Sequence, residues 1–185
     1  MASRLRQAGI DPVVTREPGG TPLGERVRQI FLEPGAAIDP LAEAFLVNAS
    51  RAQLVDDVIA PALRAGRLVL SDRFATATLA YQGFGRGVDR DILRAIGAIA
   101  TRGLEPDVVL LIDVPVELSR QRLARRAAGD QTFPDRLERE DGNFHARVRE
   151  GYLELSRTDA HILKLDGTLE PAALLGSACA ALGLP

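Results

Sequence analysis

Apolar and polar positions along the chain follow two different periods, and their alternation predicts the secondary structure. Four short apolar runs have the length and composition of β-strands, and segments of helical period separate them. The predicted strands cover residues 12–15, 67–71, 107–114 and 161–165. Because strands that alternate with helices form parallel sheets with crossover helices, the predicted fold is a three-layer α/β/α domain.

The longest predicted helix begins with Asp39 as N-cap and Pro40 in its first turn, and its apolar residues recur at near-helical spacing until Gly66. Pro61 is expected to kink its last turn. Further helices are predicted over 3–8, 23–32, 89–101, 115–127, 139–158 and 170–181. A crossover helix such as 3–8 normally follows a central strand, so that strand is expected to be missing. No repeat or linker divides the series, and residues 1–185 are expected to form one domain.

Composition narrows the class of protein and its partners. With 46% hydrophobic and 26% charged residues, the 185-residue chain is typical of a single soluble domain. Its formal net charge of −2 provides no field that would attract nucleic acid or an anionic membrane, so neither is expected as a partner. The single cysteine, Cys179, has no disulfide partner in the chain, which favours a cytoplasmic location.

A glycine-rich segment with arginines on both sides, TREPGGTPLGERVR, follows the first predicted strand. Ligands of open parallel sheets bind beyond the carboxyl ends of the strands, where Arg16 and Glu17 lie in this prediction. The glycines after Pro18 allow backbone N–H groups to approach an anion, and the helix that follows favours negative charge at its N-terminus. The segment is therefore a candidate phosphate-binding loop. A tight turn with a surface salt bridge is the alternative.

Asp72 and Arg73 follow the second predicted strand. A carboxylate at this position can hold Mg²⁺, and an adjacent guanidinium group can bind phosphate. An ordinary ion pair at the end of a strand would have the same sequence.

Thr78, Tyr81 and Gln82 precede a second glycine-rich turn. An amide both donates and accepts hydrogen bonds, so Gln82 suits the edge of a nucleobase. A helix end capped by Gly83 is the structural alternative. Arg51 lies four residues after Val47 on the long helix, so the two side chains are expected to share a face.

Residues 126–138, RAAGDQTFPDRLE, interrupt the helical period and carry charge at both ends. The segment is a candidate mobile lid, and an ordinary surface loop is the alternative. Several guanidinium groups over a site could neutralise charge on a transferred phosphoryl group. The arginines in and before this segment are Arg120, Arg122, Arg125, Arg126 and Arg136.

The motifs TREPGGTPLGE, SRAQ, SDRF, AYQGFGRG and PDRLE occur in an order and spacing that resemble the bacterial thymidylate kinase family, and the resemblance covers Leu5 to Leu184. The resemblance implies a P-loop kinase fold, a cytoplasmic homodimer, and Mg²⁺-dependent phosphoryl transfer from ATP to dTMP. A kinase for another nucleoside monophosphate and a non-catalytic nucleotide-binding or dimerisation module are the alternatives.

The resemblance also implies roles for individual residues. Arg16, Glu17, Pro18 and Arg28 would form the monophosphate pocket. Asp72 and Arg73 would contact the dTMP phosphate and the metal. The nucleoside would meet Val47, Arg51, Thr78, Tyr81 and Gln82. A lid from about Arg125 to Arg136 would supply the catalytic cations Arg125, Arg126 and Arg136, and Arg120, Arg122 and Arg125 would serve the ATP side.

Three departures from the family pattern stand out. Val47 occupies a position that is usually Phe and stacks on thymine, so either weaker binding or compensation by Phe45 is expected. Phe74 replaces a frequent Tyr. The G-x-x-x-x-G-K-[ST] phosphate loop does not occur in the 185 residues. We expect that loop and its strand to be encoded upstream of Met1. The alternative is a true truncation that binds nucleotide poorly.

Overall fold

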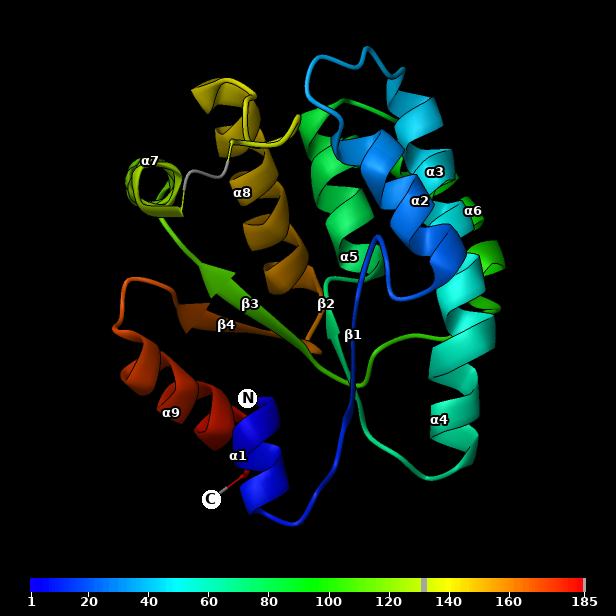
Figure 1. Ribbon diagram of the computed structural model, residues 1–185, viewed down its shortest axis with the longest axis vertical. Coiled ribbons are helices and arrows are strands. Elements are labelled where there is room, and N and C mark those ends of the chain that lie inside the picture. Colours follow the sequence, from blue (N-terminus) through cyan, green and yellow to red (C-terminus); the bar gives the residue numbers. More distant parts are fainter. Residues whose placement is uncertain (131–132, 185) are drawn as a thin grey trace.

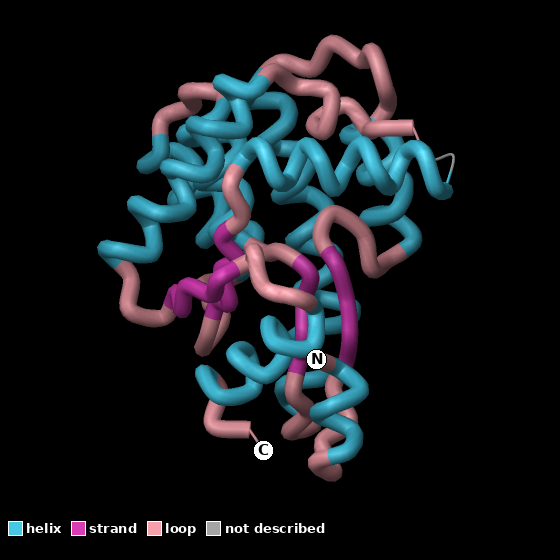
Figure 2. The backbone as a smooth tube through the Cα atoms, turned by 90° about the vertical axis from the view of Figure 1, so that its left-hand side faces the viewer, coloured by secondary structure: helices cyan, strands magenta, loops and turns pink. Residues whose placement is uncertain are grey.

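Residues 1–130 and 133–184 are described by a computed structural model, in which parallel strands lie between two groups of helices (Figures 1 and 2). The strands are β1 (Val13–Arg16), β2 (Val69–Asp72), β3 (Val109–Asp113) and β4 (Ile162–Asp166). The helical elements are α1 (Ala2–Gln7), α2 (Pro22–Leu32), α3 (Pro40–Leu54), η1 (Val55–Ile59), α4 (Ala60–Arg64), α5 (Ala75–Thr78), η2 (Leu79–Gly85), α6 (Arg90–Thr101), α7 (Val116–Asp130), α8 (Gly142–Thr158) and α9 (Pro171–Ala181).

The strands form two parallel pairs. In the first pair Val13 of β1 lies opposite Val69 of β2, and in the second pair Val109 of β3 lies opposite Ile162 of β4. The predicted parallel α/β fold is confirmed, and each predicted strand forms within two residues of its expected bounds. Within the described residues the two pairs do not hydrogen-bond to each other.

The long helix begins where its sequence predicts. The Asp39 carboxylate accepts hydrogen bonds from the backbone N–H of Leu41 at 2.9 Å and of Ala42 at 3.3 Å, which caps the first turn of α3. Instead of running as one α-helix to its end, the chain changes to the π-helical turn η1 just before α4, which contains Pro61. A π-helical turn changes the hydrogen-bond register, and proline itself has no N–H to donate.

Two helix predictions need correction. The helix predicted from residue 139 begins at Gly142, because the Asp141 carboxylate caps it by accepting the Phe144 N–H at 2.7 Å. The segment after β2 forms the short helix α5 and the π-helical element η2, neither of which the periodicity predicted. Short π-helical segments occur often at functional sites.

The helices are divided between two regions. Figure 1 shows α2, α3 and α6 beside one another, and Figure 2 shows a smaller group of helices near the two termini. The main apolar cluster joins α2, α3, η2 and α8 through Phe31, Val47, Ala80, Phe144 and Val148. None of the helices in the described part of the chain has both the length and the apolar character needed to cross a lipid bilayer.

Candidate functional site

Two helical faces of matching spacing meet at the centre of the candidate site. One belongs to α3 and the other runs from α5 through η2 to the residue that follows it, and each carries site side chains at intervals of four residues, as neighbours on one helical face do. Their members are Glu43, Val47 and Arg51 on α3, and Thr78, Gln82 and Arg86 opposite.

We call these six side chains the buried ladder. Arg51 is fully buried at the end of the ladder that lies nearest the strands. Its Nε donates to Glu17 Oε2 at 2.8 Å, and its Nη2 donates to Glu17 Oε1 and to Thr78 Oγ1, the latter at 2.7 Å. Nη1 donates to Asn48 Oδ1 at 2.7 Å. These bonds use four of the five guanidinium N–H groups and leave one on Nη1, in a side chain that has no exposed surface. The predicted contact of Arg51 with thymine stays a prediction.

The glycine-rich loop after β1 is held by the protein's own side chains. Gly19 N–H donates to Ser50 Oγ at 3.1 Å, and Gly20 N–H donates to Glu25 Oε1 at 2.9 Å. Glu25 also forms an ion pair with Arg16 at 2.8 Å. The Arg16 hydrogen bond and then the Gly20 N–H hold the pKa of Glu25 below its usual value. The idea that these amides await an anion is therefore wrong for this structure, because internal acceptors already occupy them.

The loop still brings two predicted pocket residues together. Arg28 Nη1 donates to the carbonyl oxygen of Pro18 at 3.1 Å, and the Glu17–Pro18 peptide bond is cis. The loop is therefore held from two helices. Arg28 of α2 bonds its backbone at Pro18, and Arg51 of α3 bonds the carboxylate of Glu17. These bonds hold the loop at the edge of the site, and its role in phosphate binding stays a prediction.

The carboxyl edge of the first strand pair carries exposed charge. Arg16 lies opposite Asp72 in the parallel register, and Arg73 follows directly. Arg73 has φ of 72°, in the left-handed region that non-glycine residues rarely adopt. The guanidinium carbon of Arg73 lies 5.0 Å from the centre of the Tyr81 ring. The strain marks this residue for a functional role, and the charges suit a phosphate.

Tyr152 is a site residue that the sequence reading missed. It lies on α8, and its ring meets that of Tyr81 edge-on at 6.4 Å between centroids. Burial raises the pKa of its phenol above the usual value, and the nearby Tyr81 raises it further. Its place in the apolar stripe of α8, four residues after Val148, was the available signal.

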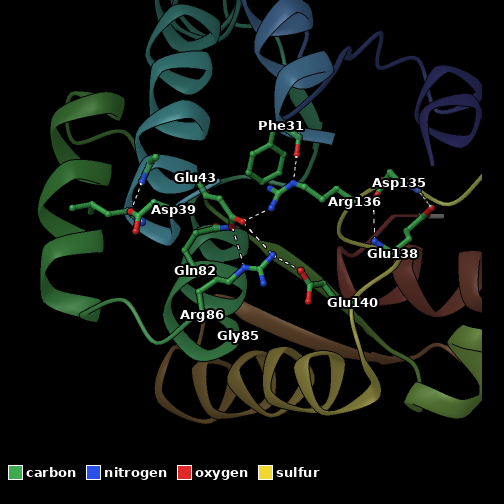
Figure 3. A network of polar contacts seen from close by, with 12 residues as sticks. Phe31, Asp39, Glu43, Gln82, Gly85, Arg86, Asp135, Arg136, Glu138 and Glu140 are labelled. Carbon is green, nitrogen blue, oxygen red and sulfur yellow. Dashed lines mark hydrogen bonds and ion pairs between the residues drawn. The ribbon is translucent and has the colours of Figure 1, made fainter. Parts of the chain in front are cut away.

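Glu43 is the second missed residue and the junction of the network in Figure 3. Its fully buried carboxylate accepts hydrogen bonds from Gln82 Nε2 at 2.9 Å, Arg136 Nη1 at 2.5 Å and Arg86 Nε at 3.4 Å, and it forms an ion pair with Arg86 Nη2 at 3.1 Å (Figure 3). Arg86 Nη2 also donates to Glu140 Oε1 at 2.6 Å. A lone buried carboxylate is costly, so the cations around Glu43 are needed to stabilise it. Its place four residues before Val47 in the predicted helix was the available signal.

The predicted lid arginines lie in three different environments. Arg120 and Arg125 are exposed on α7. Arg122 Nη1 donates to the Gly167 carbonyl at 2.8 Å, and Arg126 pairs with Glu138 at 2.6 Å. Residues 131 and 132 of the predicted lid lie outside the described residues.

Arg136 is buried at the base of this segment. Its Nε donates to the Phe31 carbonyl at 2.9 Å, in addition to the contact of Nη1 with Glu43. Its catalytic role stays a prediction, as do those of Arg125 and Arg126.

Phe45 does not compensate for Val47 in this structure. Val47 is buried in the main apolar cluster, whereas the side chain of Phe45 is 54% exposed. Two positions on a helix are separated by about 200° around its axis, so the side chains of these two residues point to opposite faces of α3.

The structure allows a test of whether these residues suit Mg²⁺. Among the described residues, no three His, Cys, Asp or Glu side chains gather into a metal-ligand cluster. Asp72 is an exposed carboxylate beside Arg73 at the carboxyl edge. Mg²⁺ in phosphoryl-transfer enzymes is bound through one or two carboxylates together with substrate phosphates, and a single Asp72 fits that mode.

Parallel strands with helical crossovers, and a polar cluster beyond the carboxyl ends of β1 and β2, define an open α/β protein of the nucleotide-binding class. Comparison with known proteins makes this assignment specific. A family model described as thymidylate kinase matches residues 1–175, and the chain belongs to the thymidylate kinase family.

Individual relatives agree with the family match. The chain is 50% identical over 169 residues to the thymidylate kinase of Deinococcus radiodurans, covering 91% of this chain and 80% of that protein. It is 49% identical over 172 residues to that of Thermomicrobium roseum, covering 92% and 80%. With the thymidylate kinase of Geobacter sulfurreducens it shares 47% identity over 162 residues, covering 86% and 76%.

Proposed function

We propose that this protein transfers the γ-phosphoryl group of ATP to the 5′-phosphate of dTMP, giving dTDP. Membership of the thymidylate kinase family supports the reaction. The observation that carries the proposal is the buried ladder between α3 and the segment α5–η2, in which Arg51 donates to Thr78 and Gln82 donates to Glu43. A ladder of this kind suits the polar edge of a pyrimidine.

In this proposal the chain acts by positioning and by neutralising charge. Arg73 and Arg16 bind the acceptor phosphate at the carboxyl edge, while Arg51 and Gln82 hold the base. Transfer is in line between the two nucleotides and needs no covalent intermediate. Asp72 would hold the Mg²⁺ that accompanies ATP, and the ion supplies charge neutralisation on the phosphates. Arg125 and Arg126 are the lid cations best placed by sequence to face the transferred group.

The acceptor preference is tested by calorimetry and by a coupled kinase assay with dTMP, dUMP, dCMP and AMP. We expect dTMP to bind most tightly and to be the best acceptor. Preference for another monophosphate would overturn the proposal. In a longer form that includes the phosphate loop, Arg73→Ala is expected to lower dTMP turnover by about a hundredfold or more, since it removes a positive charge from the site of the reacting phosphate. Near-normal turnover would refute the role of Arg73.

We also propose a homodimer formed through α2, α3 and α6, which lie side by side in Figure 1. Large apolar side chains remain exposed on each of these three helices, and an apolar surface gathered on neighbouring helices would suit an interaction site. They are Leu23, Ile30, Leu41, Phe45, Ile92 and Ile99. Because the buried, unpaired Cys179 is compatible with a reducing compartment, we place the protein in the cytoplasm.

A further inference from the structure

Glu43 controls which end of the Gln82 amide faces a ligand. The two ends of a glutamine amide have nearly the same shape, but one donates and the other accepts hydrogen bonds. Glu43 lies 2.9 Å from Gln82 Nε2 (Figure 3). An ionised carboxylate can only accept, so the NH₂ end of Gln82 must face Glu43 and the carbonyl end must face away.

The carbonyl end of Gln82 is available to a ligand. No hydrogen bond among the described residues uses Gln82 Oε1, although the side chain is almost fully buried. The completely buried side-chain atoms without a partner in the described chain belong to Thr15 and Arg136. Gln82 Oε1 is therefore an acceptor that no described group occupies, in a side chain that is only 2% exposed.

Arg51 supplies the complementary group. Thr78 Oγ1 accepts from Arg51 at 2.7 Å and lies one helical turn before Gln82, so the three side chains belong to one face. Together, the spare N–H of Arg51 and the Oε1 of Gln82 present one donor and one acceptor. A pyrimidine with a carbonyl at C4 and an N–H at N3 offers the matching pair. Cytosine offers an amino group and a bare ring nitrogen, which is the opposite pair.

We propose that Glu43 is a positioning residue that fixes the acceptor polarity of Gln82 and thereby selects a nucleotide whose base carries an N–H beside a carbonyl. The inference rests on the proposed function, because it requires the acceptor base to bind against Arg51 and Gln82. It goes beyond that function by assigning base selectivity to a side chain that touches no ligand.

A purely structural role for Glu43 must be separated from this one. Its carboxylate also pairs with Arg86 and Arg136, so its loss is expected to lower stability in either case. Glu43→Gln has nearly the same shape and lets the Gln82 amide rotate, because an amide at 43 can donate as well as accept. The matched control is Arg86→Gln, which breaks an ion pair to the same carboxylate and leaves the Glu43–Gln82 bond in place.

The test is the ratio of dTMP to dCMP affinity, measured by calorimetry on the full chain. We expect this ratio to fall by about tenfold in Glu43→Gln. In this variant Gln82 can turn its NH₂ end to the base and donate to the bare ring nitrogen of cytosine, which the wild-type orientation does not allow. In Arg86→Gln the ratio should stay within about twofold of the wild-type value, even where the melting temperature falls.

A second measurement needs no nucleotide. In ¹⁵N-labelled protein, the side-chain N–H₂ protons of Gln82 should exchange with solvent more slowly than those of exposed glutamines, and Glu43→Gln should remove this protection. Unchanged selectivity in Glu43→Gln overturns this inference alone. Failure of the wild-type chain to bind dTMP overturns the proposed function and this inference with it.

Discussion

Arg51 carries a full positive charge and has no exposed surface. Its position is tolerable because both oxygens of the Glu17 carboxylate accept from it and Asn48 and Thr78 accept two more of its hydrogen bonds. Burying an ion pair costs desolvation free energy that a well-packed apolar pair would avoid, so such a pair is weak evidence for stability. Its two ends nevertheless have to stay together, because either charge alone would be buried without a partner. Here the pair links the loop after β1 to α3.

Removal of one partner should therefore be severe. Glu17→Ala leaves the Arg51 guanidinium buried and without its counter-charge, and we expect the free energy of unfolding to fall by about 3–5 kcal/mol. Urea unfolding followed by circular dichroism measures it. Asp56→Ala is the control, because its partner Arg102 is exposed and such pairs contribute about 1 kcal/mol or less. Equal losses of unfolding free energy in Glu17→Ala and Asp56→Ala would contradict the structural importance of the buried Glu17–Arg51 pair.

Tyr152 gives a prediction about pH. Burial raises the pKa of its phenol, so the neutral form is favoured in the folded state, relative to an unfolded value of about 10. The resulting stabilisation is complete below pH 10 or so and is lost as the pH rises from there towards the folded pKa.

The chain has two tyrosines and no tryptophan, so tyrosinate absorbance can be followed directly. One ionisation should accompany alkaline unfolding, and Tyr152→Phe should remove it. The difference between the absorbance titrations of the wild type and of Tyr152→Phe gives the ionisation of Tyr152. Ionisation near pH 10 in the folded protein would be inconsistent with its burial.

At the scale of elements, η2 and α8 are held close by two glycines. A Cβ atom at Gly151 would lie 2.5 Å from the Phe84 ring, and one at Gly85 would lie 2.7 Å from the Phe144 ring. Each aromatic ring thus occupies space that any larger residue opposite would fill. This close packing sets the distance between α8, which carries Tyr152, and η2, which carries Gln82.

Gly151→Ala tests this packing. We expect it to lower the free energy of unfolding by about 1–3 kcal/mol, because the added methyl group overlaps Phe84. Gly176→Ala in α9 is the matched control, since a Cβ there meets nothing within 4 Å and alanine should stabilise the helix by about 0.5–1 kcal/mol. Thermal unfolding of both variants measures these changes in stability. A stabilised Gly151→Ala would show that η2 and α8 can move apart to accept the methyl group.

For the whole molecule, the exposed apolar faces of α2, α3 and α6 determine the expected assembly. Phe45 is 54% exposed and Ile99 is 77% exposed, which is unfavourable for residues of this size in an isolated chain. Burial against a second copy would remove this surface from water.

Phe45→Glu combined with Ile99→Glu should convert a dimer into a monomer, because two carboxylates would be buried in the interface. Sedimentation velocity measures the change. Phe133→Glu is the control, since Phe133 is 87% exposed and lies in the predicted lid segment, away from these helices in the sequence. A monomeric wild-type protein, or a double variant that remains dimeric, would reject this interface.

Much of the fold followed from local pattern. The four strands, the capped start of α3 at Asp39 and most helix bounds were predictable because apolar period and capping residues act over a few neighbouring positions. The glycine-rich turn after Tyr81 gave no such signal for η2, because a π-helical register depends on packing against α8 as much as on local preference. Arg16, Asp72 and Arg73 were expected at one sheet edge, and the parallel register brings them there.

The sequence by itself determined the fold class, the family and the positions of the charged residues after the strands, since all three depend on residue types at fixed spacing. Only the tertiary structure decided which groups those charges meet. Glu25 and Ser50 occupy the loop amides that looked open to an anion, and Glu43 gathers Gln82, Arg86 and Arg136. The reason is physical: a buried charge takes its partner from whatever chain lies within hydrogen-bonding distance, and sequence separations of up to 105 residues are closed only by folding.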